Sequence, residues 1–317
     1  MPDVLIAEDI RGNGVDALSA RFDVSFQPDL WRDPVRLATQ LGEARALIVR
    51  NQTTVDAALL RSAKKLLVIG RAGVGLDNVD VAAATRAGTV VTYTPDQNAI
   101  SVAELAIGLM ISLARNIPAA SADTQGGKWS RRRFWGTELY GKSFGIIGAG
   151  RIGFLTARRA QALGMKILAC DPLISRDNVL LSELSAESLS LEDLLTRADV
   201  ISCHLPATPK TTKLLDAACF ARMKPTAIFL NTSRGQVVDE AALLAALKRG
   251  ELGGAGLDVR AKEPPEVSEL EKLPNVLLTP HIGALTYEAQ DRVTAAICED
   301  VARVLDGKAP FYAVRHC

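Results

Sequence analysis

Three polar residues in the second half of the chain could perform acid–base chemistry on a carboxylic acid. They are Arg234 in the segment NTSRG, Glu263 in GLDVRAKEPP and His281 in TPHIG. A histidine beside a carboxylate is held in one tautomer and can exchange a proton near neutral pH. An arginine can donate two parallel N–H bonds to a substrate carboxylate. Because each residue follows an apolar run, the three are expected to converge if those runs are strands of one sheet.

Each of these residues also has an ordinary structural explanation. Arg234 could pair with a surface acid, Glu263 could be a loop acid before two prolines, and His281 could be a satisfied core histidine. Their joint occurrence after apolar runs favours the catalytic interpretation. His204 in CHLPAT is expected on the cofactor side of the site, and His316 near the C-terminus is expected to be solvated.

A glycine-rich turn in the middle of the chain indicates a dinucleotide site. The segment GIIGAGRIG contains Gly148, Gly150 and Gly153 in the spacing G-x-G-x-x-G, after an apolar run and before a helical pattern. The first glycine permits the tight turn, the second lets a pyrophosphate approach the backbone, and the third lets helix and strand pack closely. The N–H groups at the helix N-terminus can then bind the anion.

A carboxylate follows where the adenosine ribose of such a cofactor would lie. Asp171 ends the next predicted strand, KILACD, and could accept hydrogen bonds from the ribose hydroxyls. Its charge would repel the additional phosphate of NADP, so NAD (NADH) is the expected cofactor, although Arg176 nearby would soften this preference. The alternative is a structural turn with a chance aspartate, which the combination of strand, helix and acid disfavours.

The elements that must position these residues repeat one pattern: a short β-branched run, a turn and an amphipathic helix. Strands are predicted at 4–9, 46–50, 66–71, 90–95, 143–148, 166–171, 200–206, 227–233, 254–259 and 275–281. Continuous apolar strands alternating with helices indicate parallel sheets covered on both faces. The expected fold class is α/β, with two doubly wound parallel-sheet domains: a Rossmann nucleotide-binding domain inserted in a flavodoxin-like substrate domain.

The length of 317 residues suits two such domains. A long amphipathic pattern at 287–307 is expected to return to the first unit and to make it discontinuous. We therefore predict a substrate-binding (catalytic) domain of residues 1–97 plus 284–317. Residues 98–283 would form the NAD-binding domain.

Composition and charge disfavour several other classes of protein. The formal net charge of +1 gives no general electrostatic case for a nucleic-acid or membrane-surface partner. The five cysteines include no C-x-x-C pair, so neither a disulfide framework nor a metal site is expected, and a cytoplasmic location fits best. The apolar run at 105–114 is too short for a membrane span, and the opening MPDVLIAEDI lacks the basic region of a secretory signal.

Several segments together resemble the D-2-hydroxyacid dehydrogenase family, and within it the phosphoglycerate dehydrogenases. The likeness covers nearly the whole chain and includes GRAGVGLDNVD, AEL, GKWSRRRFWGTEL, the glycine-rich turn, NTSRGQVVDE, and KEPP followed by TPHIGA. It implies an oxidoreductase that transfers a hydride between nicotinamide and C2 of a D-2-hydroxy acid or 2-oxo acid. His281 would be the acid/base, Glu263 its partner, and Arg234 the clamp on the substrate carboxylate and carbonyl.

The resemblance also implies binding residues. The cofactor set is Gly148, Gly150, Arg151, Ile152, Gly153, Asp171, His204, Pro206, Thr232 and Asp258. The substrate set is Arg50, Arg71, Val74, Gly75, Asn98 and Arg132 (or Arg133). Backbone N–H groups around Val74 and Gly75 would hold the substrate carboxylate, and the arginines would hold a phosphate or sulfonate end. The three consecutive arginines at 131–133 could equally form a solvated charged face. Similar proteins dimerise through the arm that here spans roughly 112–140, so a homodimer is expected.

Two departures from the family pattern leave the substrate open. Phosphoglycerate members usually carry a long regulatory domain after the final helix, and neither this domain nor serine feedback through it is expected here. The segment TPDQNAIS places Asp96 and Gln97 near the substrate side, and IVRNQT resembles relatives that act on sulfolactate. The candidates are 3-phosphoglycerate, sulfolactate, and hydroxypyruvate or glyoxylate. An NAD-sensing binding module of the transcriptional corepressor type is the alternative from another class.

Overall fold

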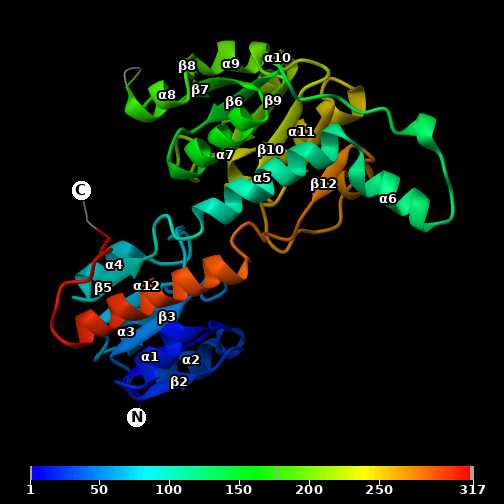
Figure 1. Ribbon diagram of the computed structural model, residues 1–317. Helices are drawn as coiled ribbons and strands as arrows, with labels where there is room; N and C mark the ends of the chain where they lie inside the picture. Colours follow the sequence, from blue (N-terminus) through cyan, green and yellow to red (C-terminus); the bar gives the residue numbers. More distant parts are fainter. Residues whose placement is uncertain (1, 176–177, 315–317) are drawn as a thin grey trace. The chain divides into compact units, whose positions relative to one another are not determined.

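The chain divides into two compact units in a computed structural model that describes residues 2–175 and 178–314. Unit 1 comprises Met1–Asn98 with Leu285–Cys317, and unit 2 comprises Ala99–Ala284 (Figure 1). Arg176 and His316, for which the sequence predicts an effect on cofactor preference and a solvated position, lie outside the described residues. Each unit is built around its own sheet, and all strand pairs among the described residues are parallel.

Unit 1 contains a five-stranded sheet of the flavodoxin type. In spatial order the strands are β2 (Val24–Phe26), β1 (Val4–Ile6), β3 (Ala46–Val49), β4 (Val68–Arg71) and β5 (Val90–Tyr93). The helical elements are α1 (Asn13–Ser19), η1 (Leu30–Arg32), α2 (Pro34–Leu41), α3 (Ala57–Ser62), α4 (Val81–Arg86) and α12 (Tyr287–Leu305). The order 2-1-3-4-5 is that of doubly wound sheets that bind ligands at the carboxyl ends of their strands.

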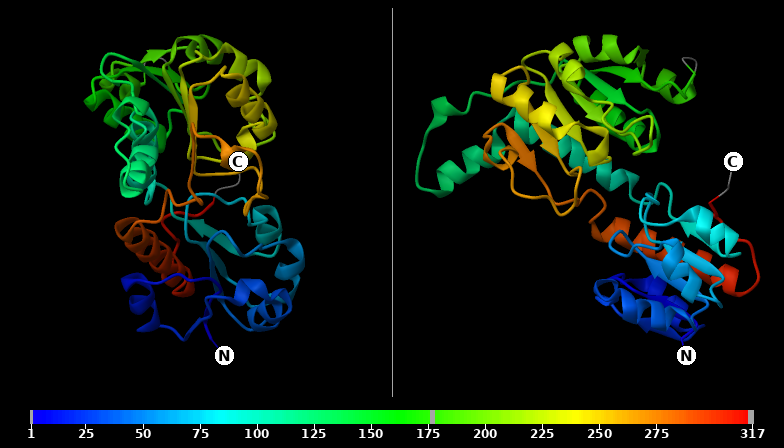
Figure 2. Two further views of the ribbon diagram at one scale, coloured as in Figure 1. Left: turned by 90° about the vertical axis from the view of Figure 1, so that its right-hand side faces the viewer. Right: turned by 180° about the vertical axis from the view of Figure 1, so that it is seen from behind.

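Alternate residues of each strand supply the two cores of unit 1. Val4 and Ile6 pack with apolar residues of α1 and α12 on one face of the sheet. Leu5 and Ala7 pack with α2, α3 and α4 on the other face. This alternation reflects the two-residue period of a strand, and it explains why central strands buried on both faces are apolar throughout. The last helix, α12, thus completes the unit that the N-terminus begins (Figures 1 and 2).

Unit 2 contains a seven-stranded sheet of the Rossmann type. In spatial order the strands are β12 (Val276–Leu278), β11 (Gly254–Leu257), β10 (Ile228–Asn231), β9 (Val200–Cys203), β6 (Ser143–Ile147), β7 (Lys166–Cys170) and β8 (Glu187–Ser188). The strand order reverses between β6 and β9, and such switch points bind ligands in open α/β sheets.

Helices cover both faces of this sheet. The helical elements are α5 (Ala99–Ala114), α6 (Ile117–Gln125), η2 (Arg131–Arg133), α7 (Arg151–Ala162), α8 (Val179–Glu183), α9 (Leu191–Arg197), α10 (Ala217–Arg222), η3 (Gly235–Val237), α11 (Glu240–Arg249) and η4 (Leu270–Lys272). One core is formed with α5, α7 and α8, and the other with α9, α10 and α11. Within the described ranges no single helix is long and apolar enough to cross a membrane; α5 and α6 pass that test only as a pair bent by 64°.

Polar side chains define where many helices begin. In each case the side-chain oxygen accepts a hydrogen bond from a backbone N–H of the first turn, a contact that stabilises a helix by about 1 kcal/mol. The residues with this role are Asp33 (α2), Asp56 (α3), Asp80 (α4), Ser190 (α9), Asp216 (α10), Asp239 (α11) and Thr286 (α12).

An arm leaves the body of unit 2 after α5. It contains α6 and η2, neither of which has a buried residue, and it projects away from the sheet (Figures 1 and 2). Its base is fixed because the Thr137 N–H donates to the carbonyl of Ala114 (2.7 Å) and Asn116 Nδ2 donates to the carbonyl of Trp135 (3.0 Å). Trp129 and Trp135 are 77% and 86% exposed.

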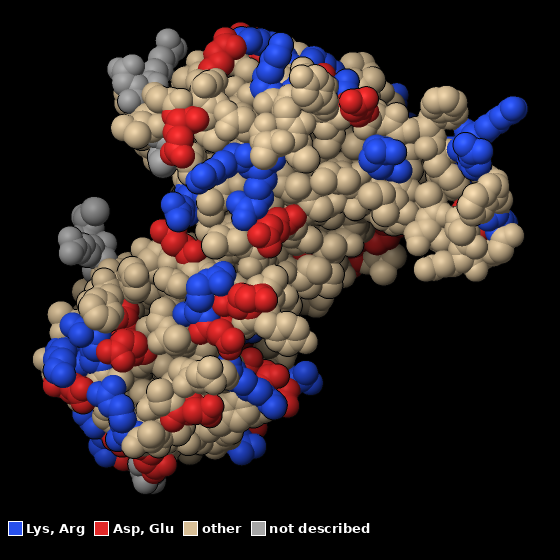
Figure 3. Space-filling view, in the orientation of Figure 1, with Lys and Arg blue, Asp and Glu red and all other residues tan. Residues whose placement is uncertain are grey.

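Charged side chains of both signs are interspersed over the face shown in Figure 3, so neither unit presents a broad field of one sign on that face.

The strands predicted from the sequence are present, but most end earlier than predicted. The predicted 200–206 is β9 (Val200–Cys203), and the predicted 275–281 is β12 (Val276–Leu278). The residues beyond each true end lie in the loops that carry polar side chains. Two short edge strands, β2 and β8, were not predicted because each is partly exposed and has no apolar run.

Candidate active site

Three neighbouring strands of unit 2 end at the same edge of the sheet. Asn231 of β10 pairs with Leu257 of β11, which pairs with Leu278 of β12. Arg234, Glu263 and His281 all follow these paired positions. The parallel register therefore delivers all three loops to one edge, as the sequence predicts.

His281 and Glu263 are in direct contact. His281 Nδ1 lies 2.6 Å from Glu263 Oε2, and both side chains are about one-third exposed (37% and 33%). An ionised carboxylate can only accept a hydrogen bond, so in this pair the proton resides on Nδ1. Nε2 of a neutral ring is then the nitrogen that can accept a proton from a substrate hydroxyl.

The surroundings of Glu263 keep it ionised. Partial burial favours the neutral acid, but hydrogen bonds from His281 and from the Arg260 N–H, together with the charge of Arg234, outweigh it and lower the pKa of Glu263. Glu263 Oε1 accepts the Arg260 N–H at 3.0 Å. Arg234 is therefore near enough to act electrostatically on the pair, while its Nη1 donates to the carbonyl of Ser233 (2.7 Å).

The turn that carries Arg234 is held by a side chain that sequence reasoning did not single out. Asn231, 1% exposed, donates from Nδ2 to the carbonyl of Arg234 (3.0 Å) and accepts from the N–H and Oγ of Ser233 (3.0 and 2.7 Å). Gly235 follows, and a Cβ there would lie 1.9 Å from the carbonyl carbon of Arg260. The Arg234 turn and the loop leading to Glu263 are thus in backbone contact.

A buried aspartate fixes the loop that carries His281. Asp258, 1% exposed, accepts from Thr279 Oγ1 (2.6 Å) and from the N–H groups of Ile282 and Gly283 (both 2.8 Å). His281 itself has φ of +55°, a left-handed conformation that a non-glycine residue adopts only when its surroundings hold it there. Asp258, predicted on the cofactor side, therefore also positions the histidine.

The glycine-rich turn forms the cradle predicted from its spacing. Gly148 has φ of +93°, where a side chain would be strained, and a Cβ on Gly153 would lie 2.2 Å from the carbonyl oxygen of Gly148. Gly150 differs, because a Cβ there would meet nothing within 4 Å. The open space lies at the N-terminus of α7, where Arg151 is exposed and Ile152 is partly buried.

Asp171 lies beside this turn at the end of β7. Its Oδ2 accepts the Ala149 N–H and its Oδ1 accepts the Leu173 N–H, both at 2.9 Å. A carboxylate has about four acceptor sites, so these two bonds leave capacity for ribose hydroxyls.

Two buried polar atoms lie beyond the neighbouring strands β9 and β10 without a hydrogen-bond partner among the described residues: His204 Nδ1 and Thr232 Oγ1. Ser202 Oγ lies 2.9 Å from the other ring nitrogen, His204 Nε2. Burial lowers the pKa of His204 to about 4, so the ring is neutral. Unpartnered buried groups are rare, and a polar ligand would satisfy them. Together with the glycine cradle they fit a dinucleotide; Pro206 lies in the same loop as His204 and is exposed.

Unit 1 places the predicted substrate arginines at one edge of its own sheet. Val49 of β3 pairs with Arg71 of β4, and Arg50 follows Val49 directly. Burial lowers the pKa of Arg50, although Glu8 and Asp9 partly offset the effect.

The loop of Arg50 is cradled by a buried acid that sequence reasoning missed. Glu8, 2% exposed, accepts the N–H groups of Arg50 (2.8 Å), Gln52 (3.1 Å) and Thr53 (3.0 Å). The Arg50 guanidinium also donates to Gln290 Oε1. No local sequence signal links Glu8 to a loop more than forty residues away.

The other predicted substrate residues lie at the end of β4, in the loop that follows it, after β5 and on η2. Arg71 is 8% exposed, and its Nη1 occupies the space that a Cβ on Gly73 would need. Val74 follows and is 37% exposed, with Gly75 next to it. Asn98 Oδ1 is buried without a hydrogen-bond partner in the described part of the chain. Arg132 lies on η2, in the arm of unit 2, and is exposed.

Comparison with known proteins gives a consistent result. Residues 107–283 match the family described as D-isomer specific 2-hydroxyacid dehydrogenase, NAD binding domain. D-3-phosphoglycerate dehydrogenase of Mycobacterium tuberculosis is 46% identical over 308 residues, which are 97% of this chain and 58% of that protein. The chain thus spans little more than half the length of this relative.

Solved structures resemble the chain over nearly its whole length. A Thermus thermophilus protein superposes with a TM-score of 0.92 and 36% identity, covering 98% of this chain and 99% of that one. A glyoxylate reductase from Paecilomyes thermophila has a TM-score of 0.86 and 30% identity, covering 98% and 97%. With the family match, the paired parallel register and the glycine cradle, these likenesses show that the chain belongs to the D-isomer-specific 2-hydroxyacid dehydrogenase family and contains its NAD-binding domain.

Proposed function

We propose that the protein is an NAD-dependent dehydrogenase of D-2-hydroxy acids, with His281, Glu263 and Arg234 as its catalytic residues. The observation that carries this proposal is the 2.6 Å contact between His281 Nδ1 and an ionised Glu263, at the sheet edge that also carries the glycine cradle. A histidine whose Nδ1 is occupied by a carboxylate presents Nε2 as a proton acceptor or donor.

In this proposal His281 and Glu263 serve proton transfer, and Arg234 serves substrate binding. Bound NAD would supply the hydride acceptor, and NADH the donor. In oxidation, His281 Nε2 takes the proton of the C2 hydroxyl, and the Glu263 carboxylate stabilises the imidazolium that forms. Arg234 holds the substrate carboxylate and carbonyl through charge-assisted hydrogen bonds. In reduction, the protonated ring returns its proton to the carbonyl oxygen.

The proposed substrate carries a second anionic group, as 3-phosphoglycerate or sulfolactate does. Two arginines at adjacent strand ends, Arg50 and Arg71, support this choice, as does the likeness to a D-3-phosphoglycerate dehydrogenase. Hydroxypyruvate or glyoxylate is the alternative, supported by the likeness to a glyoxylate reductase.

We propose in addition that the protein is a homodimer formed through the arm. Two largely exposed tryptophans on a projecting segment without buried residues form the kind of surface that aromatic-rich interfaces bury.

A panel of acids tests the proposed reaction. The purified full chain is incubated with NAD and each of D-3-phosphoglycerate, sulfolactate, D-glycerate, glycolate and D-lactate, and nicotinamide absorbance is followed. NADH formation with a phosphorylated or sulfonated acid, falling with salt because partly exposed charge pairs are screened, supports the proposal. Activity on D-lactate equal to that on the phosphorylated or sulfonated acids would show that Arg50 and Arg71 do not determine specificity. NADH binding without turnover of any of these acids would contradict the proposed reaction.

A further inference from the structure

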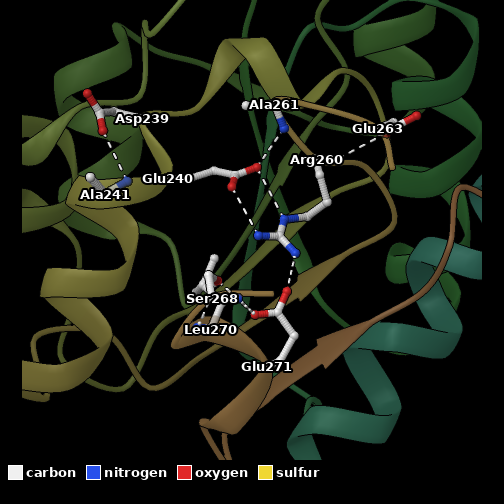
Figure 4. A network of polar contacts seen from close by, with 9 residues as sticks. All are labelled: Asp239, Glu240, Ala241, Arg260, Ala261, Glu263, Ser268, Leu270 and Glu271. Atoms are coloured by element: carbon white, nitrogen blue, oxygen red, sulfur yellow. Dashed lines mark hydrogen bonds and ion pairs between the residues drawn. The ribbon is translucent and has the colours of Figure 1, made fainter. Parts of the chain in front are cut away.

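Arg260 is a buried arginine in the loop between Asp258 and Glu263. Its side chain is only 8% exposed and makes ion pairs with two acids from different elements (Figure 4). Nε and Nη2 donate to the two carboxylate oxygens of Glu240 (3.2 and 3.1 Å), the first residue of α11. Nη1 donates to Glu271 Oε1 (2.6 Å) in η4.

Both acids are themselves fixed to the surrounding backbone. Glu240 Oε1 also accepts the Ala261 N–H (2.6 Å), and Glu271 Oε2 accepts the N–H and Oγ of Ser268 (2.8 and 2.7 Å). Although desolvation opposes ionisation, hydrogen bonds from Arg260 and Ser268 lower the pKa of Glu271 to about 2. One guanidinium therefore joins α11, η4 and the 260–263 loop.

Stability alone is a weak explanation for this network. Desolvating charges costs free energy, and buried ion pairs can often be replaced by apolar residues without loss of stability. A guanidinium fork held by two anions does, however, restrict the geometry of the backbone that carries it.

The backbone of Arg260 contacts the catalytic pair directly. The Arg260 N–H donates to Glu263 Oε1 (3.0 Å), and Glu263 Oε2 contacts His281 Nδ1 (2.6 Å). On the other side, the carbonyl carbon of Arg260 lies 1.9 Å from the position that a Cβ of Gly235 would take, and Gly235 immediately follows Arg234. Gln236 Nε2 donates to the carbonyl of Ala261 (3.2 Å), which closes the contact between the two loops.

We propose that Arg260 is a positioning residue for the catalytic pair. Its ion pairs to Glu240 and Glu271 fix the 260–263 loop so that Glu263 holds His281 in the Nδ1–H tautomer, with Nε2 free for the substrate. Other charged groups near the loop include Arg234, Asp258 and Lys262, the last of which pairs with Glu266. Beside Glu271, Glu269 pairs with Lys272 and Lys248. The kinetic consequence of this positioning rests on the proposed function, whereas the tautomer of His281 does not.

Nitrogen-15 NMR of the histidine rings in the full chain tests the proposal without cofactor or substrate. The chain has three histidines, and H281Q identifies the signals of His281. At alkaline pH the two ring-nitrogen shifts report the tautomer. Wild type should show the Nδ1–H form, and R260K, which keeps the charge but loses the fork, should show a larger share of the Nε2–H form.

E271Q is the second variant, in case R260K does not fold, because it keeps a hydrogen-bond acceptor at the same place. It should shift the tautomer in the same direction by a smaller amount. The matched control is R249K: Arg249 lies in the same helix as Glu240 and pairs through two nitrogens with Glu251, but it is exposed and remote from the loop. R249K should keep the wild-type tautomer.

Kinetics separate this proposal from the proposed function. R260K should lower kcat about tenfold or more while KM for NADH stays within about twofold, since misplacing a catalytic group affects the chemical step. Wild-type tautomer in folded R260K and E271Q would overturn the positioning role, even with a reduced Tm. A shifted tautomer with unchanged kcat would leave the positioning of His281 intact and contradict its assignment as the acid/base.

Discussion

The two histidines described in the structure differ in what surrounds them. His281 is partly exposed, and its Nδ1 contacts the carboxylate of Glu263. His204 is shielded, and its contact is the neutral hydroxyl of Ser202. A ring that stays neutral can form hydrogen bonds to a ligand, but it cannot act as a general acid or base near neutral pH.

His204 should make stability depend on pH in the absence of cofactor. Its pKa is lowered from 6.5 to about 4 in the folded chain by burial. Between these values the unfolded chain binds more protons, so the free energy of unfolding falls as pH decreases through this window and is insensitive to His204 above it. The full window corresponds to about 3 kcal/mol.

Urea unfolding at pH 7 and pH 5 measures this contribution. The His204→Gln variant should lose about 2 kcal/mol less than wild type on acidification, whatever its stability at pH 7. Equal losses in the two proteins would show that burial does not lower the pKa of His204 in the folded chain.

At the scale of elements, two glycines of the turn have different functions: Gly153 allows α7 to pack closely on the turn, and Gly150 leaves open space at the N-terminus of α7. Separate substitutions can distinguish these functions. Gly153→Ala places a Cβ 2.2 Å from a backbone oxygen, so α7 must move from the turn. Gly150→Ala places a Cβ in open space with an ordinary φ of −65°. The first variant should lose about 1–3 kcal/mol of stability, together with NADH affinity. The second should keep wild-type stability and lose only affinity, because its Cβ fills the cradle.

Tm measurements and fluorescence titration with NADH check this pair of variants. A stable Gly150→Ala protein with wild-type affinity would show that the cofactor does not approach the turn there.

Element positions were predictable from the sequence where local pattern decides them, and contacts between distant segments were not. Apolar runs located β10, β11 and β12, and their shared edge followed from the parallel fold. The left-handed backbone of His281 and the brace from Asp258 depend on where β11 and the 279–283 loop meet, which no local pattern encodes. The Arg260 network is similar: in sequence, RAKEPP presents an arginine and a lysine as surface charges, and only the packing of α11 and η4 buries the former.

At the scale of the whole molecule, the arm of unit 2 bears on the proposed homodimer. Trp135 is 86% exposed, and its carbonyl takes part in the contact with Asn116 at the base of the arm. If the arm forms a homodimer interface, Trp135→Asp should raise the dimer dissociation constant about 30-fold or more, because a buried tryptophan is a typical interface hot spot.

Sedimentation velocity over a concentration series measures the assembly. Val35→Asp serves as the control, since Val35 is 78% exposed and belongs to unit 1, whereas the arm belongs to unit 2. A wild-type monomer, or a Trp135→Asp dimer as tight as wild type, would contradict assembly through the arm.

The proposed role of His281 is tested by the activity of His281→Gln on the best acid of the panel, with NADH binding followed in parallel. Glutamine keeps polarity and approximate size but cannot exchange a proton, and the cradle for the cofactor lies on other loops. We expect kcat to fall by about 10²-fold or more while NADH still binds with wild-type affinity. A variant that binds NADH and turns over at nearly the wild-type kcat would contradict the assignment of His281 as the acid/base.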